Sequence, residues 1–181
     1  NFTANTITTI TSDSPDPSVV GEAVTVNFTV TAVAGAGTPT GDVTVSDGAV
    51  SCTGTVAAGT CNLAFTSAGA KTLTATYGGD ANFNGSSDIE DHTVNKANTT
   101  TTITSDDPDP SAVGGVVAVN YTVAVVAPGA GTPTGNVTVS DGTDSCTGTL
   151  PATSCNLIFT SPGAKTLTAT YAGDASFNGS T

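Results

Sequence analysis

Several stretches of the chain alternate between apolar and polar residues. In residues 23–33 the even-numbered positions are apolar, and threonine or asparagine fills most of the odd-numbered ones. The main apolar residues of this stretch are Val24, Val26, Phe28 and Val30. Residues 43–45, 61–65 and 73–77 show the same alternation. A period of two is typical of β-strands that bury one face, so the pattern predicts an all-β fold.

The chain contains two near-copies of one sequence. TTITSDSPDPS, at residues 8–18, returns as TTITSDDPDPS at residues 101–111. GTPTGDVTVSDG, at residues 37–48, returns as GTPTGNVTVSDG at residues 131–142. An internal repeat of this length indicates that each copy is one structural unit. Gly, Pro, Asp and Ser residues divide each copy into about seven short strands, which fits a two-sheet β-sandwich.

We therefore predict two domains, residues 1–95 and residues 96–181. They are joined around residues 95–97, where Asn-Lys-Ala offers none of the glycine or serine of a flexible linker.

Two motifs in each copy resemble a known family. TPTGDVTVSDG, at residues 38–48, followed by GAKTLTATYGGDANFNGS, at residues 69–86, resembles the bacterial immunoglobulin-like repeats of long surface and secreted proteins. The second copy carries TPTGNVTVSDG and GAKTLTATYAGDASFNGS. The resemblance implies tandem immunoglobulin-like β-sandwiches arranged end to end as stalks, spacers or adhesive arms, without shared catalytic residues. The chain departs from antibody-type domains because it lacks the core tryptophan and the widely spaced cysteine pair between the sheets.

Composition narrows the possible functions. The net charge is −12 at pH 7, from 15 Asp and Glu against 3 Lys and Arg, and such a surface repels nucleic acid and anionic lipid. No apolar run reaches the roughly 18 residues that cross a membrane. One histidine and no Trp or Met leave few side chains for catalysis. We predict a protein that is not an enzyme, requires no cofactor, binds no nucleic acid and does not insert into a membrane.

The four cysteines form two pairs with equal spacing, Cys52 with Cys61 and Cys146 with Cys155. A zinc site favours CxxC pairs or several histidines, and His92 is the only imidazole. CTGTVAAGTC can fold as a hairpin that brings its two sulfurs together. We predict a disulfide within each domain, which indicates an oxidising compartment outside the cell or in a periplasm. Pairing between domains and free thiols in a reducing compartment are the alternatives.

One loop has the spacing of a calcium site. GDANFNGSSDIED places oxygen-bearing side chains at the ligand positions of a D-x-[DN]-x-[DN]-G loop. These candidates are Asp80, Asn82, Asn84, Asp88 and Asp91. Alternate side chains and one carbonyl can converge there on a hard cation. In the alternative interpretation, the segment is an ordinary turn in which Phe83 fills the core.

A rival calcium site would form at the junction of the two domains. In one sandwich domain, the loop after the first strand lies at the end from which the chain leaves the domain. The turn before the last strand lies at the opposite end, where the chain enters the domain. Asp13 and Asp16 would then approach Asp174 and Asn178 beside the linker. Carboxylates at a narrow joint repel one another unless a cation or water separates them, so calcium would stiffen the joint. The alternative is proline-fixed turns with solvated acids.

The second copy is shorter at its end than the first. Thr181 aligns with Ser87, whereas the first copy continues with DIEDHTVNKA, which we expect to form its final strand. A sandwich without that strand would expose an apolar groove and unpaired backbone groups. Either the sequence is a slice of a longer array, or a neighbouring chain donates a strand, with Phe2 as a candidate anchor. We expect His92, on that final strand, to face solvent.

These observations predict an extracellular or cell-surface structural protein that forms a rod, a stalk or part of a head-to-tail fibre. Its partners would be copies of itself or further repeats. The alternative is an adhesin or glycan-binding module that recognises cell-surface glycans. That function favours an aromatic-lined patch, and only 5% of the residues are aromatic.

Overall fold

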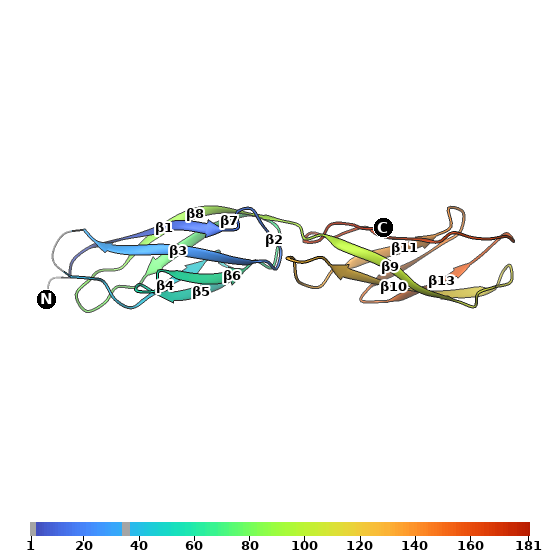
Figure 1. Ribbon diagram of the computed structural model, residues 1–181, viewed down its shortest axis with the longest axis horizontal. Coiled ribbons are helices and arrows are strands. Elements are labelled where there is room, and N and C mark those ends of the chain that lie inside the picture. The colour runs from blue at the N-terminus through green and yellow to red at the C-terminus, as the bar shows by residue number, and fades with distance from the viewer. Residues whose placement is uncertain (1–2, 34–36) are drawn as a thin grey trace. The chain divides into compact units, whose positions relative to one another are not determined.

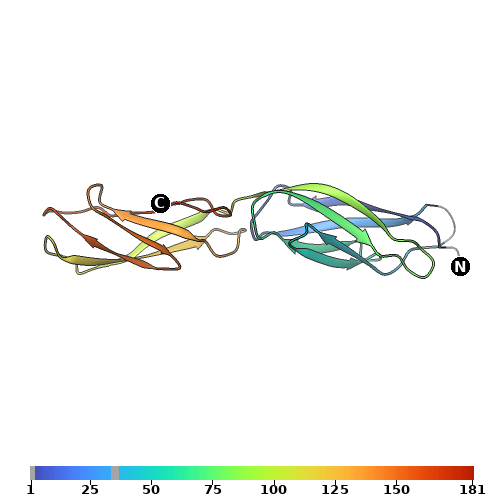
Figure 2. The same ribbon diagram turned by 180° about the vertical axis from the view of Figure 1, so that it is seen from behind.

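The chain divides into two compact units, Asn1–Asn95 (unit 1) and Lys96–Thr181 (unit 2) (Figure 1). The structure is a computed structural model that describes residues 3–33 and 37–181. Each unit is built from β-strands and loops, as the view from behind also shows (Figure 2). No helix among the described residues is long and apolar enough to cross a membrane. The predicted all-β fold is confirmed.

Unit 1 consists of two sheets. The three-stranded sheet has the order β1-β3-β6, with β1 (Thr6–Ser14), β3 (Ala23–Ala32) and β6 (Thr60–Ala64). The five-stranded sheet has the order β2-β8-β7-β4-β5, with β2 (Ser18–Val19), β8 (Ser86–Asn95), β7 (Gly69–Tyr77), β4 (Asp42–Ser46) and β5 (Ser51–Thr55). Neighbouring strands are antiparallel, except that β2 and β8 run parallel.

Unit 2 repeats this plan with fewer strands. One sheet has the order β13-β10-β9, with β13 (Ser154–Ile158), β10 (Val116–Val125) and β9 (Thr99–Asp107). The other has the order β12-β11-β14, with β12 (Ser145–Leu150), β11 (Gly135–Ser140) and β14 (Thr168–Tyr171). Among its described residues, unit 2 has no strand that corresponds to β2 or β8.

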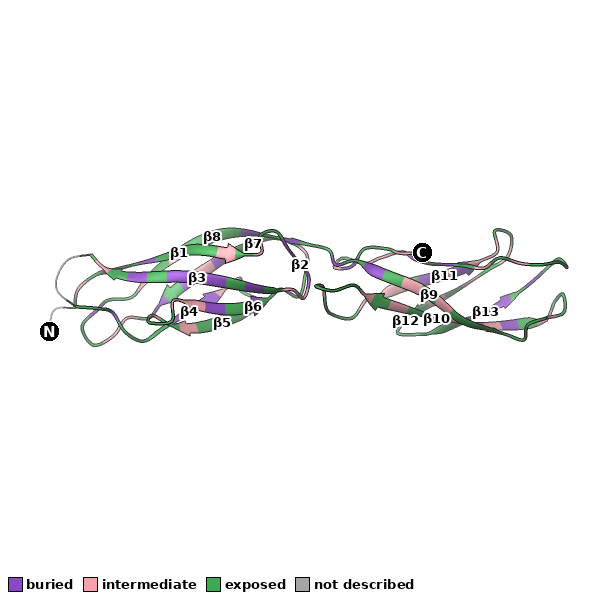
Figure 3. Ribbon diagram, in the orientation of Figure 1, coloured by how far each residue is buried: buried purple, intermediate pink, exposed green. Residues whose placement is uncertain are grey.

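The core of each unit is formed by the alternating apolar residues. Along β3 the buried and exposed residues alternate (Figure 3), and Val24 and Val26 are both 0% exposed. In unit 2, Val117 and Val119 of β10 are buried in the same way. Burial of a valine or leucine side chain contributes about 1.5 to 3 kcal/mol. The predicted strand faces are therefore confirmed by the burial pattern.

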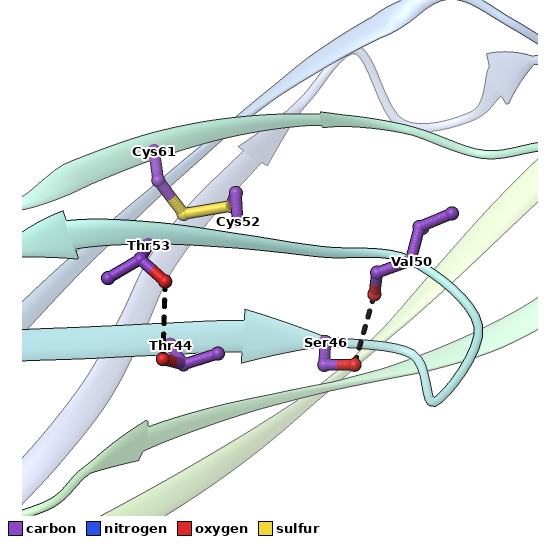
Figure 4. The surroundings of a disulfide bond; sticks show 6 residues. All are labelled: Thr44, Ser46, Val50, Cys52, Thr53 and Cys61. Atoms are coloured by element: carbon purple, nitrogen blue, oxygen red, sulfur yellow. Dashed lines mark hydrogen bonds between the residues drawn. A yellow bond between two sulfur atoms is a disulfide. The ribbon is translucent and has the colours of Figure 1, made fainter.

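A disulfide joins the two sheets at one edge of each unit. Cys52 of β5 is bonded to Cys61 of β6, with a Cα–Cα distance of 5.7 Å (Figure 4). Cys146 of β12 is bonded to Cys155 of β13, with a Cα–Cα distance of 5.8 Å. In both units the two bridged strands are the edge strands of different sheets. Each bond therefore links the two layers of one sandwich.

The bridged segment differs from the predicted hairpin. The chain does turn between β5 and β6, where the backbone N–H of Gly59 donates to the carbonyl oxygen of Thr55. However, no ladder pairs β5 with β6 in the described chain, because each of them pairs within its own sheet. Close approach is possible because residue 54 is glycine: a Cβ there would lie 2.1 Å from the carbonyl oxygen of Thr60.

We predict that the double variant Cys52→Ser/Cys61→Ser lowers the free energy of unfolding of unit 1 by about 2 to 3 kcal/mol, because it opens a short loop in the unfolded chain. Hydrogen exchange read by mass spectrometry in urea reports the two units separately. Unit 2 is the internal control, and Ser51→Ala, at an exposed position of β5, should change stability by less than about 0.5 kcal/mol. An unchanged unfolding midpoint for unit 1 would contradict the prediction.

Candidate functional site

The GDANF segment of unit 1 forms a turn organised by the Asp80 carboxylate. Its oxygens accept hydrogen bonds from the backbone N–H groups of Asn82 (2.8 Å) and Phe83 (3.0 Å). They also accept from the backbone N–H and the hydroxyl of Thr40, both at 2.9 Å. The N–H groups of Asn82 and Thr40 lower the pKa of Asp80 to about 2. The carboxylate thus fixes its own loop and ties it to the loop before β4.

The aromatic residue of this turn is buried. Phe83 is 7% exposed, and its counterpart in unit 2, Phe177, is 4% exposed. A Cβ at Gly37 would lie 3.1 Å from the Phe83 ring. This arrangement agrees with the interpretation of the segment as a turn whose aromatic side chain fills the core.

The structure does not gather the five candidate ligands of the calcium loop around one point. The amide nitrogen of Asn84 donates to the Asn5 side chain, and Asp88 accepts from the backbone N–H of Ile10. Asp91 accepts from the hydroxyl of Thr72. The reason is that β8 begins at Ser86. Asp88 and Asp91 lie three positions apart in an extended strand and project from opposite faces, so these two side chains do not converge on one point. The calcium loop stays a prediction.

The unit 2 counterpart is also a hydrogen-bonded turn. Asp174 accepts from the backbone N–H groups of Ser176, Phe177 and Thr134, all at 2.8 Å. Burial alone would raise the pKa of Asp174, but these donors, together with the Thr134 hydroxyl, lower it to about 2. The amide of Asn178 donates to the Asn98 side chain. The junction site would combine these residues with residues of unit 1, and it stays a prediction.

His92 is buried, so its predicted exposure to solvent is wrong. The residue is 1% exposed. Its Nδ1 lies 2.5 Å from Oδ2 of Asp13 and 3.5 Å from Oδ1 of Asp16. Its Nε2 lies 2.8 Å from Oγ of Ser18, and its ring stacks on Phe65 with a centroid distance of 4.7 Å. One imidazole thus connects β8 to β1, to β2 and to the segment that follows β6.

A sequence signal for this burial was present. His92 stands two positions before Val94, so both side chains project from the same face of β8, and Val94 is 2% exposed. The alternation places His92 in the core with Val94. A buried imidazole requires polar partners, and the two aspartates and one serine in SDSPDPS supply them.

Within residues 3–33 and 37–181, the one group of three side chains that could bind a metal ion consists of Asp13, Asp16 and His92. A potential ligand atom from each of the three lies within 4.8 Å of the others. The Nδ1 of His92 is already engaged, because it donates to the Asp13 carboxylate. Thr93 donates its backbone N–H to Oδ1 of Asp16 at 3.0 Å. These hydrogen bonds hold the three side chains of the cluster to one another and to β8.

The order Asp13–His92–Ser18 has the bonding pattern of a catalytic triad, with the carboxylate on Nδ1 and the hydroxyl at Nε2. A nucleophilic serine must reach its substrate. Ser18 is 0% exposed, so no substrate can approach its hydroxyl. The arrangement therefore acts as a structural tie and not as a catalyst.

We predict that His92→Ala lowers the free energy of unfolding of unit 1 by about 2 to 4 kcal/mol, because it leaves a cavity beside Phe65 and removes the partner of Asp13 and Ser18. Hydrogen exchange in urea measures the effect for each unit. Thr93→Ala, at the exposed neighbouring position, is the matched control and should change stability by less than about 0.5 kcal/mol. Equal effects of the two substitutions would contradict the role of the imidazole.

Two solved structures with low sequence identity are similar to this chain. A tetra-tandem repeat in the extending region of a large adhesion protein is 20% identical, with a TM-score of 0.47, and the alignment covers 98% of this chain and 47% of that one. The fibronectin(III)-like modules of CbhA from Clostridium thermocellum are 16% identical, with a TM-score of 0.36 and coverage of 96% and 89%. This chain thus spans about half of the adhesion-protein structure. Similarity at this level does not indicate a function.

Family membership rests on both copies. No curated protein matches the chain. A model of the bacterial Ig-like domain (group 3) matches residues 10–102 and again residues 103–181, which together are nearly all of the chain. This agrees with the resemblance carried by the TPTG and GAKTLTATY motifs of each copy. The chain belongs to the bacterial Ig-like domain family (group 3).

Proposed function

We propose that the chain is a structural segment of an extracellular or cell-surface protein, in which the repeats act as a spacer, a stalk or part of a fibre. The observation that carries the proposal is that each unit is a sandwich whose two sheets are tied by its own disulfide. The polar clusters of the candidate site are engaged in holding loops and strands together. Such a module contributes length and stability rather than chemistry.

The cysteines support a location outside the reducing cytosol. All four are paired, two within each unit, and stable structural disulfides are typical of secreted and surface proteins. The net charge of −12 favours solubility and opposes association with nucleic acid or anionic lipid. The proposed partners are therefore further repeats or other copies of this chain, joined head to tail.

A catalytic role is not part of the proposal. The only histidine is buried, and the Ser18 hydroxyl bonded to it is 0% exposed. Backbone N–H groups of their own turns donate to Asp80, Asp141 and Asp174 and lower the pKa of each to about 2. A general acid or base requires a pKa near the working pH, and values of about 2 keep these groups ionised at neutral pH.

The glycan-binding alternative has little support among the described residues. Flat aromatic faces would provide the recognition surface for it. Of the nine Phe and Tyr residues, eight are buried, and Phe2 lies outside the described residues, as does its predicted role as an anchor for strand donation. The polar strand faces present mainly threonine, which suits a solvated sheet.

Immunogold electron microscopy with an antibody raised against this chain tests the location and role of the protein. We expect label on the surface of the producing cell or along filaments that extend from it, with antibody pre-absorbed on the purified chain as the control. Alkylation during isolation should modify no cysteine before reduction and four after it. Label confined to the cell interior, or thiols that react without reduction, would contradict the proposal.

Calcium removal tests whether a metal contributes to stability. We propose that the fold requires no cation, because backbone N–H groups already donate to Asp16, Asp80 and Asp174. The thermal midpoint should therefore be equal in EDTA and in about 5 mM calcium, well above the affinities of about 0.1 to 1 mM of extracellular modules. A higher thermal midpoint in calcium than in EDTA, if Asp16→Asn abolishes the difference, would contradict this proposal and support the junction site. The control is Asp42→Asn, which changes an exposed residue of β4.

A further inference from the structure

The first and last segments of unit 1, residues 4–20 and residues 82–95, lie side by side. Where the chain enters the unit, Ala4 and Phe83 form a parallel bridge. Where it leaves the unit, β2 pairs in parallel with the last two residues of β8. Between these points β1 lies beside β8 and runs in the same direction (Figure 1). The two segments are therefore parallel neighbours, and each of them carries one end of the chain of this unit.

Hydrogen bonds connect the two segments all along their length. The Ser86 hydroxyl lies 2.8 Å from the hydroxyl of Thr6 and 2.7 Å from that of Thr8. The backbone N–H of Ile10 donates to the Asp88 carboxylate at 2.8 Å. The series ends with the buried imidazole cluster and the ladder between β2 and β8. Contacts of this kind follow one another from the end where the chain enters to the end where it leaves.

Tension on the two chain ends would load these contacts together. It would pull residue 4 outward at one end of the unit and residue 95 outward at the other end. Because the two segments are parallel, this force acts along them and slides one past the other. No contact can then open before its neighbours, so all of them share the load. A force applied across the two segments would instead open the contacts one after another.

Every way of separating the two chain ends breaks the same contacts. The first segment can detach only if β1 leaves both β3 and β8, and the last segment only if β8 leaves β7, β1 and β2. The contacts between the first and last segments are common to both routes. The disulfide belongs to neither route, because it joins β5 to β6, which carry neither chain end.

We propose that the contacts between residues 4–20 and residues 82–95 form a force-bearing clamp, through which unit 1 transmits tension between its chain ends without unfolding. The clamp rests on the proposed function, because a spacer or a stalk is pulled at both ends. Forced unfolding depends on the unfolding rate and not on the equilibrium stability alone. The clamp therefore gives β8 and its polar contacts a role under load, in addition to closing the sandwich.

Optical tweezers test the clamp on the chain of residues 1–181 by changing the direction of the load. Azide-bearing residues at the exposed positions Thr3 and Asn95 attach the handles, so that unit 1 alone is pulled along the clamp. Handles at Thr3 and at the exposed Ala81 pull the same two segments apart from one end. At equal constant force, unfolding along the clamp should be at least about tenfold slower, because several hydrogen bonds must open together. Equal rates in the two geometries would overturn the proposal.

Two variants separate resistance to force from stability at equilibrium. Ser86→Ala removes the hydroxyl that meets Thr6 and Thr8, so it should raise the unfolding rate along the clamp about tenfold. Cys52→Ser/Cys61→Ser acts mainly on the unfolded chain and should change that rate less than about twofold. An unchanged rate for Ser86→Ala, or equal acceleration by both variants, would overturn the proposal.

Failure of the clamp can be distinguished from failure of the proposed function. Rates that do not depend on the direction of the load would overturn the clamp, and the surface label and paired cysteines expected above would be unaffected. Label confined to the cell interior would overturn the proposed location, and the rates measured on the purified chain would be unaffected.

Discussion

Strand β8 provides the contacts on which the rest of unit 1 depends. It pairs with β7 and β2 in one sheet, and its Asp88 and His92 side chains bond to β1 in the other. The disulfide between Cys52 and Cys61 ties the same two sheets at the opposite edge. The sandwich is thus closed on both sides. This closure explains why an imidazole, a serine and two aspartates that resemble a reactive cluster serve a structural role instead.

Comparison of the two units shows which features of a repeat form without a strand of the β8 type. Unit 2 keeps the disulfide, the aspartate-organised turn and the buried aromatic residue, as in Asp174 and Phe177. These features depend on contacts among β12, β13, the loop before β11 and the turn at Asp174. Val113 is 53% exposed, against 2% for Val20 of unit 1. The GAKTL segment lies in β7 of unit 1 but precedes β14 in unit 2, although its five residues are identical.

The sequence was informative where a structural feature depends on a short, regular spacing of residues. Alternation predicted the buried positions of β3, and the equal spacing of the cysteines pointed to the pairs that the structure forms. It was less informative where polar residues have two possible roles. The spacing from Asp80 to Asp91 matches a calcium loop, and the start of a strand at Ser86 cannot be inferred from that spacing. His92 was misjudged because its polarity was given more weight than its register with Val94.

The most direct test of these conclusions compares amide hydrogen exchange in the two GAKTL segments, residues 69–73 and 163–167, in a chain that consists of residues 1–181. Their sequences are identical, so their intrinsic exchange rates are nearly equal and the difference reports structure. If β8 closes the repeat, the first segment should exchange at least about a hundredfold more slowly than the second, which corresponds to about 2.7 kcal/mol of added protection. Equal protection of both segments would contradict the account.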